Sequence, residues 1–498
     1  MTNVRIIALA LIISLLGINP IHSQDIHSLD LETSIEIAKR QSNTMLMLME
    51  RLDQAAYNLK ATTSQYKTRV SMDFTLPQYT ETVRRFEDSL GYYFTPIRQN
   101  LISTNLTINQ PLPTDGFLFI QSGVENYIDY YAGDRNSQIT SRVGLRQPID
   151  ALFGVNNYQL NKKQAHLSYE MALKGLKRQE LDLVYIVSQY FYNVLSTQEA
   201  MNIARLNLEN QQESYDIAQN KYDAGLIREV EALQMEVDLT EASNDYENAR
   251  TSFAAQTRIF KEAIGINLVD SIIIENKMEY RPIIVNSDLA VSKAMANRTE
   301  LRESQIQIDL QKMNIKRQRA AGRISGDILL NYNFIGVDQS NRSIPIGTSI
   351  DNTLQDLTGR PGSFGVGLTA SIPIIDWGAN KARVKSAESM LKQNRIQMEE
   401  TKINIESEIR SLVDQMHNSL RGLEAMEKSV IVAQKTFDIS KQRYANGEID
   451  SQYMAQERDR LKGAYTRKLK SYISYKLSLS DLMRKTFFDF EKGLELGD

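Results

Sequence analysis

The chain has 498 residues, no cysteine and a nearly balanced charge, with 58 Lys and Arg against 61 Asp and Glu. The absence of cysteine excludes disulfides, thiol chemistry and an anchor on an acylated N-terminal cysteine. A net charge of -3 gives no support to nucleic-acid binding. Length alone would suggest about three domains, but an internal duplication favours one elongated body.

The N-terminal residues are typical of a cleaved secretory signal. Arg5 precedes an apolar stretch from Ile6 to Leu16, and a polar exit follows, so we expect a signal peptide over 1–23. The apolar stretch is far shorter than the roughly 20 residues that a spanning helix needs. No later segment is apolar enough either, and the mean hydropathy is -0.37. If this chain crosses a membrane, we expect it to do so with strands.

Beyond the signal, helical and strand patterns alternate, and the whole order occurs twice. We expect a first repeat over 24–287, a second over 288–485 and a short C-terminal tail over 486–498. Each repeat opens with a shorter helical stretch, about 30–66 in the first and about 288–323 in the second. The chain is therefore expected to be built from duplicated helix-strand-strand-long helix units.

Four segments alternate apolar and polar residues with a period of two, as strands with one lipid-facing and one wet face do. They lie near 69–77 and 139–147 in the first repeat and near 327–335 and 363–374 in the second. Four strands cannot close a barrel with a lumen, and an open sheet edge is not tolerated in lipid. Several chains are therefore expected to share one barrel, although a soluble half-buried sheet would show the same alternation.

The first repeat contains a further alternating pair, 101–110 and 117–121, without a counterpart in the second. Its place is left open, because it either extends a barrel above the membrane or lies against it. Two stretches rich in Asn, Asp, Gly, Ser and Tyr, 126–138 and 338–363, are expected to be exposed loops.

The longest pattern is helical and runs from about 156 to 222 without proline. Apolar residues such as Leu183 and Val187 recur along it at steps of three and four, as in a coiled-coil seam. At 1.5 Å per residue such a helix is roughly 100 Å long. Return helices are expected over about 229–264 and 451–485. For the helices alone, a structural coiled coil or spectrin-like bundle is the alternative.

The same short turn separates each long helix from its return. Residues 221–227 (Lys-Tyr-Asp-Ala-Gly-Leu-Ile) recur as 443–449 (Arg-Tyr-Ala-Asn-Gly-Glu-Ile), an offset of 222 positions. Glycine takes the left-handed conformation that ends a helix. Gly225 and Gly447 are therefore expected to terminate the two long helices.

Together these residues resemble the outer membrane efflux protein family, the TolC-like exit ducts of Gram-negative bacteria. The resemblance covers nearly all of the chain beyond the signal. It implies an α+β membrane protein, a homotrimer in which four strands per protomer form a 12-stranded β-barrel continuous with a long periplasmic α-helical barrel. It rests on the two turns, on the repeat openings Asp30-Leu31-Glu32 and Asp288-Leu289-Ala290, and on the strand ends Gln147-Pro148 and Ile372-Pro373.

The resemblance implies an outer membrane channel, the passive exit duct of a tripartite efflux or type I secretion system. Its partners would be further copies of the chain, outer membrane lipid, a periplasmic adaptor (membrane fusion protein) and an inner-membrane pump of the RND or ABC type. A periplasmic structural or adaptor protein with long coiled-coil hairpins is the alternative. We expect no enzyme activity, cofactor or metal, because no zinc-type spacing, phosphate loop or nucleophile elbow occurs.

The resemblance also places both turns at the periplasmic tip, where the adaptor docks and the pore narrows. Its gate pairs a tyrosine with a carboxylate, which here are Tyr444 and Glu231. The family's best-known member has two further carboxylates where this chain has Tyr453 and Gln456, and a basic residue in place of Ile449; Asp450 is the other gate candidate. The implied docking residues are Tyr222, Gly225, Leu226, Tyr444, Gly447 and Ile449.

Overall fold

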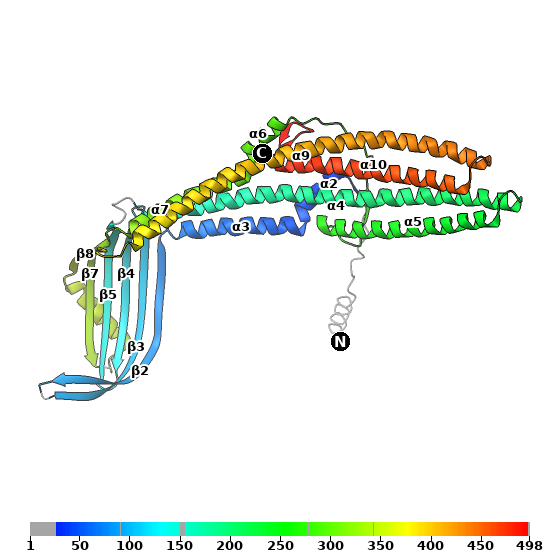
Figure 1. Cartoon of the computed structure of the whole chain (residues 1–498). Coiled ribbons are helices and arrows are strands. Elements are labelled where there is room, and N and C mark those ends of the chain that lie inside the picture. The colour runs from blue at the N-terminus through cyan, green and yellow to red at the C-terminus, as the bar shows by residue number, and fades with distance from the viewer. Residues whose placement is uncertain (1–25, 90, 150–154, 276–277, 342, 497–498) are drawn as a thin grey trace, which may run out of the picture. The chain divides into compact units, whose positions relative to one another are not determined.

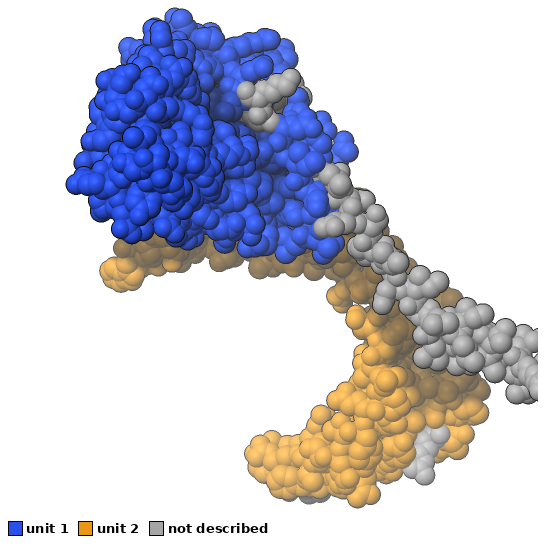
Figure 2. Space-filling view, turned by 90° about the vertical axis from the view of Figure 1, so that its right-hand side faces the viewer, with its two compact units in different colours: residues 1–50, 175–299, 402–498 blue, residues 51–174, 300–401 orange. Residues whose placement is uncertain are grey.

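The computed structural model describes residues 26–89, 91–149, 155–275, 278–341 and 343–496. The expected signal peptide lies outside these residues. Figure 2 shows two compact units, of which the first comprises residues 1–50, 175–299 and 402–498 and the second residues 51–174 and 300–401. Each unit takes residues from both sequence repeats, and the boundaries of those repeats stay a prediction.

The long helices and their returns lie where the periodicity predicts them (Figure 1). Seam residues Val187 and Val194 are fully buried in one long helix, and Ile409 and Met416 in the other. The helices of the first half are α2 (Leu31–Gln41), α3 (Asn43–Ser64), α4 (Asn157–Asp223) and α5 (Glu229–Ile264); those of the second are α6 (Ser287–Asn297), α7 (Thr299–Ala321), α9 (Ala379–Ala445) and α10 (Ser451–Thr486).

Among the described helices, none combines the length and the apolar composition that crossing a membrane requires.

Each of the two opening helical stretches is confirmed, and each is divided into two helices. The first breaks between α2 and α3 at Ser42, and the second breaks between α6 and α7 at Arg298. Both residues have extended backbones, with ψ of 141° and 124°. The Ser42 hydroxyl accepts a hydrogen bond from the Met45 N–H at 3.2 Å, so it caps the start of α3. The break is thus a capping effect that periodicity does not register.

The two halves begin with equivalent helix caps, but the equivalent residues are not the expected pair of Asp30 and Asp288. The Asp30 side chain caps α2 by accepting from the Thr33 N–H, and the Asn286 side chain caps α6 by accepting from the Leu289 N–H. The counterpart of Asp30 is therefore Asn286, two positions before Asp288. Directly before the Asp30 cap, β1 (Ile26–Leu29) pairs in parallel with β6 (Ser271–Ile274).

The second unit contains one six-stranded sheet (Figure 1). Every neighbouring pair of strands is antiparallel. The strands, in their order across the sheet, are β2 (Arg69–Asp88), β3 (Gly91–Pro111), β4 (Phe117–Asp129), β5 (Asp134–Pro148), β7 (Ser325–Asn341) and β8 (Ser363–Ser371).

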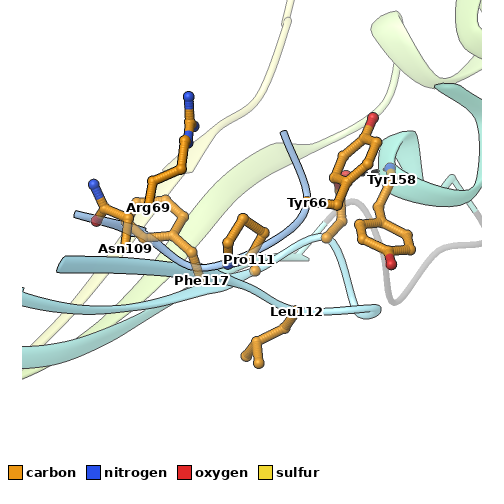
Figure 3. Close-up of a pocket in the computed structure, with 9 residues that line it drawn as sticks. Tyr66, Arg69, Asn109, Pro111, Leu112, Phe117 and Tyr158 are labelled. Atoms are coloured by element: carbon orange, nitrogen blue, oxygen red, sulfur yellow. Dashed lines mark hydrogen bonds between the residues drawn. The ribbon is translucent and has the colours of Figure 1, made fainter. Parts of the chain in front are cut away.

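The expectation of four strands per chain is therefore wrong for the described residues. The pair 101–110 and 117–121 belongs to β3 and β4, which lie within the sheet between β2 and β5. Their turn reaches the start of α4, because the Asp115 carboxylate accepts from the backbone N–H groups of Asn157 and Tyr158, each at 3.0 Å. Beside this cap the rings of Tyr66 and Tyr158 are 4.4 Å apart (Figure 3). The error came from counting strands by the repeat symmetry, which this hairpin breaks.

The two faces of the sheet differ in polarity, as the period-two pattern predicts. On the polar face, Arg146 forms an ion pair with Asp327 at 2.6 Å, and the Arg142 Nε donates to the Asn333 Oδ1 at 2.8 Å. The apolar face is exposed on β2, β4, β5, β7 and β8, whereas Leu106 and Ile108 of β3 are partly buried. Its exposed side chains include Val70, Met72, Phe74, Leu118, Ile120, Val143, Tyr332, Phe334, Phe364, Val366 and Leu368, which we call the apolar belt.

Both expected loops contain regular structure. Residues 126–138 are mostly strand, with only a short turn between β4 and β5. Residues 338–363 include α8 (Ile346–Gly359), which packs on β7 and β5. The polar composition of that stretch hid the step-of-four spacing of Ile346, Ile350 and Leu354, which is a helical signal.

Candidate functional site at the paired helix turns

The two repeated turns have the same hydrogen bonds and the same backbone conformation. Gly225 and Gly447 have φ of 69° and 79°, in the left-handed region. Their N–H groups donate to the carbonyls of Tyr222 and Tyr444 at 2.8 and 3.0 Å. The next N–H donates five residues back, from Leu226 to Lys221 at 2.8 Å and likewise in the second turn. This is the Schellman ending of a helix, which favours glycine because it has no Cβ.

The two turns lie side by side and are joined by one lysine. Lys221, in the last turn of α4, donates from Nζ to the Tyr444 backbone carbonyl at 2.6 Å. The same Nζ lies 4.5 Å from the centre of the Tyr444 ring. A cation there also interacts favourably with the negative end of the α9 dipole. One side chain therefore links the ends of both long helices.

Tyr444 is a buried residue of the second hairpin, with 5% of its surface exposed. It packs in an apolar cluster with Phe437 and Met454, and Ile449 lies against the same cluster. Burial, and then the negative charge of Glu231, raise the pKa of the Tyr444 phenol. Glu231 is thus one of the charges that act on the Tyr444 phenol, and the role of this pair in a gate stays a prediction.

Glu231 has a partner that the sequence reasoning missed. Its carboxylate lies 3.0 Å from the Nε of Arg228, across the first turn of α5. A spacing of three between a base and an acid at a helix start is a usable signal. Arg228 itself is strongly exposed, so the carboxylate is neutralised from the solvent side of the turn.

The remaining gate candidates differ in what surrounds their side chains. Asp450 caps α10, because its carboxylate accepts from the Tyr453 N–H at 2.8 Å. Tyr453 and Gln456 are exposed on the first turns of that helix. Of the expected docking residues, Tyr222 and Leu226 are exposed, with 74% of the Leu226 surface accessible. The other two side chains in that set, those of Tyr444 and Ile449, face the hairpin core.

A charged groove between α5 and α10 leads away from the turns. Its lining includes Asp238, which faces Arg458 at 3.7 Å, and Asp245, which faces Lys462 at 2.8 Å. The acidic residues Glu231, Asp238 and Asp245 recur every seven positions, so they share one helix face. That heptad spacing is the sequence signal that would have found the groove. Across the described residues, no group of three or more His, Asp or Glu side chains is arranged to hold a metal.

Comparison with known proteins decides the family. The sequence profile described as outer membrane efflux protein matches residues 124–265 and 290–484, more than half of the chain. The chain belongs to the outer membrane efflux protein family. The resemblance inferred from the turns is thereby confirmed, and with it membership in a family of TolC-like outer membrane channels that serve efflux.

Solved structures of outer membrane channels share the fold of this efflux protein. The CmeC channel of Campylobacter jejuni is 15% identical, with a TM-score of 0.66 over 94% of this chain and 87% of CmeC. VceC of Vibrio cholerae is 12% identical, with a TM-score of 0.66 over 94% and 97% of the two chains. The open state of MtrE of Neisseria gonorrhoeae is 14% identical, with a TM-score of 0.64 over 92% and 88%. No curated protein sequence matches the chain.

Proposed function

We propose that this efflux protein is the exit duct of a tripartite efflux or type I secretion system in the outer membrane of a Gram-negative bacterium. The observation that carries the proposal is the apolar belt on one face of the sheet. Phe74 and Leu368 lie at its two edges with 65% and 71% of their surfaces exposed. An exposed apolar area with side chains from five of the six strands is unfavourable in water. In lipid it becomes favourable, while the opposite face, with the Arg146–Asp327 pair, lines a wet lumen.

The proposal requires several copies of the chain. Strands β2 and β8 are the two edges of the sheet, and lipid does not tolerate unpaired strand edges. Because the six strands alternate in direction, β8 of one copy can pair antiparallel with β2 of the next. A homotrimer, the assembly that the resemblance implies, would then contribute three times six strands. A barrel of about 18 strands is wide enough for an aqueous channel.

The helices would carry the duct into the periplasm, towards its partners. Exposed Tyr222 and Leu226 lie at the first turn, and Val230 and Leu233 continue the exposed apolar surface along α5. Such a surface suits a periplasmic adaptor or the adjacent copy. An inner-membrane pump, of the RND or ABC type, would supply the driving force through the adaptor. The duct itself would be passive.

The joined turns are the proposed gate. Lys221 on Tyr444 would hold the two turns together in a closed tip, while Arg228 on Glu231 would fix the start of α5 within the first hairpin. Opening would separate the two turns and break the contact of Lys221 with Tyr444 first, because that contact links both hairpins and the pair of Arg228 and Glu231 does not. Because Tyr453 and Gln456 replace the carboxylates of the family's best-known member, a strongly cation-selective entrance is not expected.

Fractionation and assembly test the proposed function. The protein expressed with its own signal should sediment with outer membranes and require detergent for extraction. On gels without boiling it should migrate as an oligomer, and its mass in detergent should correspond to three chains. A protein that is monomeric and soluble without detergent would overturn the proposal.

A further inference from the structure

Helix α8 covers the apolar face of the sheet at the end distant from α4 and α9. The Ser349 hydroxyl lies 2.7 Å from that of Ser137 on β5 and donates to Asp338 on β7 at 2.6 Å. Ser137 and Asp338 are register partners, and the period of two puts them on the same face as Val143 and Phe334. The yellow-green α8 therefore lies on the belt side of the sheet (Figure 1).

The side of α8 that contacts the sheet is polar. Ser349 and Thr353 are its buried residues, and both make hydrogen bonds to Ser137 of β5. An amphipathic helix normally buries its apolar side. Here Ile346 and Leu354 remain 40% and 45% exposed, on a flank next to the buried seam. Ile350, which is partly buried, lies between them on the same flank, so an apolar stripe at the edge of α8 remains largely exposed in the described part of the chain.

Contacts with β7 show how α8 is placed relative to the belt. On one flank, the Asn352 Nδ2 lies 3.4 Å from the carboxylate of Asp338. On the other, Leu357 packs so closely on Gly336 that a Cβ there would lie 2.7 Å from the leucine Cβ. Gly336 is one pleat nearer to Phe334 and the belt than Asp338 is. The seam residues shift in the same way, from Ser349 at Asp338 to Thr353 at Gly336, so α8 runs along β7 towards the belt, with Leu357 of the apolar side on the sheet at its belt end.

We propose that α8 is an interfacial helix, which lies on the lipid at the outer rim of the belt with Ile346, Ile350 and Leu354 in the acyl boundary. The inference rests on the proposed function, because it takes the belt as the lipid-facing surface. The stripe itself carries no charge. Of the two α8 carboxylates beside it, Asp351 is exposed next to Ile350, and Asp356 accepts from the Val337 N–H and from Arg360, each at 2.8 Å. An uncharged apolar flank beside a polar one is the pattern of helices that lie at a membrane surface.

The absence of native cysteine makes site-specific spin labelling a direct test. Single variants Leu354→Cys and Gln355→Cys place labels on the stripe and on the adjacent exposed polar face of α8. Val366→Cys places a reference label in the belt. Each variant is reconstituted as the full chain in phospholipid nanodiscs, and the label is exposed to oxygen, which concentrates in lipid, and to a water-soluble nickel chelate.

We expect labels at 354 and 366 to collide mainly with oxygen, and the label at 355 mainly with nickel. If 354 resembles 355 while 366 stays in lipid, the inference about α8 is overturned and the channel proposal stands. If 366 itself is reached by nickel, the proposed function fails. If 354 is protected from both reagents and its spectrum shows spin–spin broadening, a second copy covers the stripe and the lipid assignment is wrong.

Discussion

Replacing Lys221 with methionine should loosen the contact between the two helix turns. Methionine keeps most of the apolar stem, but it removes the ammonium group that donates to the Tyr444 carbonyl and lies over the Tyr444 ring. The backbone hydrogen bonds that end α4 and α9 do not involve this ammonium group. The variant should therefore keep both helix endings and lose their mutual attachment.

The geometry sets the size of the effect. A hydrogen bond from a charged donor contributes about 1.5–3 kcal/mol net, and a partly exposed cation–π contact about 0.5–1 kcal/mol. Because Lys221 is only half-buried, we take about 2–3 kcal/mol for the two together. The ratio of joined to separated turns should fall roughly 30- to 150-fold.

Hydrogen–deuterium exchange measures this ratio locally. In Lys221→Met, the amides of peptides that cover 221–227 and 443–449 should exchange faster by a factor of that order. Lys441→Met is the matched control, because Lys441 also bridges α9 to α4, through Glu213 at 2.7 Å, but that ion pair is exposed on both sides. Such a pair contributes about 0–1 kcal/mol. If both variants exchange like the wild type, or if Lys441→Met has the larger effect, the proposed linkage by Lys221 is refuted.

Two further predictions concern stability. Gly447→Ala should lower the free energy of unfolding by about 1–2 kcal/mol, because Gly447 has positive φ. Gly422→Ala, in the interior of α9, should instead raise the free energy of unfolding by about 0.5–1 kcal/mol. Thermal melts that show the same sign for both variants would contradict the account. Glu408 is partly buried, which opposes ionisation, yet hydrogen bonds from Lys485 and Arg298 lower its pKa from the ordinary 4.5. Its ionised form therefore stabilises the fold above that value and loses this contribution as the pH falls through the lowered pKa. Glu408→Gln should thus be less stable than the wild type by about 1–2 kcal/mol at pH 7, with the difference vanishing in acid; a difference independent of pH would contradict this.

Most of the helical architecture follows from the sequence because the determining interactions are local. The long run without proline and its seam define α4, and a glycine in each turn defines where α4 and α9 end. The alternation of apolar and polar residues likewise predicts the two faces of the sheet. The hairpin of β3 and β4 was recognised as strand, but its position within the sheet depends on long-range pairing that a single sequence does not reveal.

The role of the candidate site stays a prediction, and the sequence did not reveal the contacts of its residues. Tyr444 and Glu231 were identified by position, and the charge of Glu231 contributes to the raised pKa of the Tyr444 phenol. Lys221 was not singled out, since its carbonyl partner lies 223 residues away in the sequence. Asp450 was treated as gate charge, although an Asp just before a helix is commonly a cap. Tertiary proximity decides such roles.

Single-channel recording tests the central claim most directly. Purified protein in planar lipid bilayers should show stepwise ion conductance, small while the turns are joined and larger or more often open in Lys221→Met. The Lys441→Met control should resemble the wild type. Folded, oligomeric protein that inserts into bilayers yet stays silent in the wild type and in both variants would contradict the claim that this chain forms an outer membrane duct.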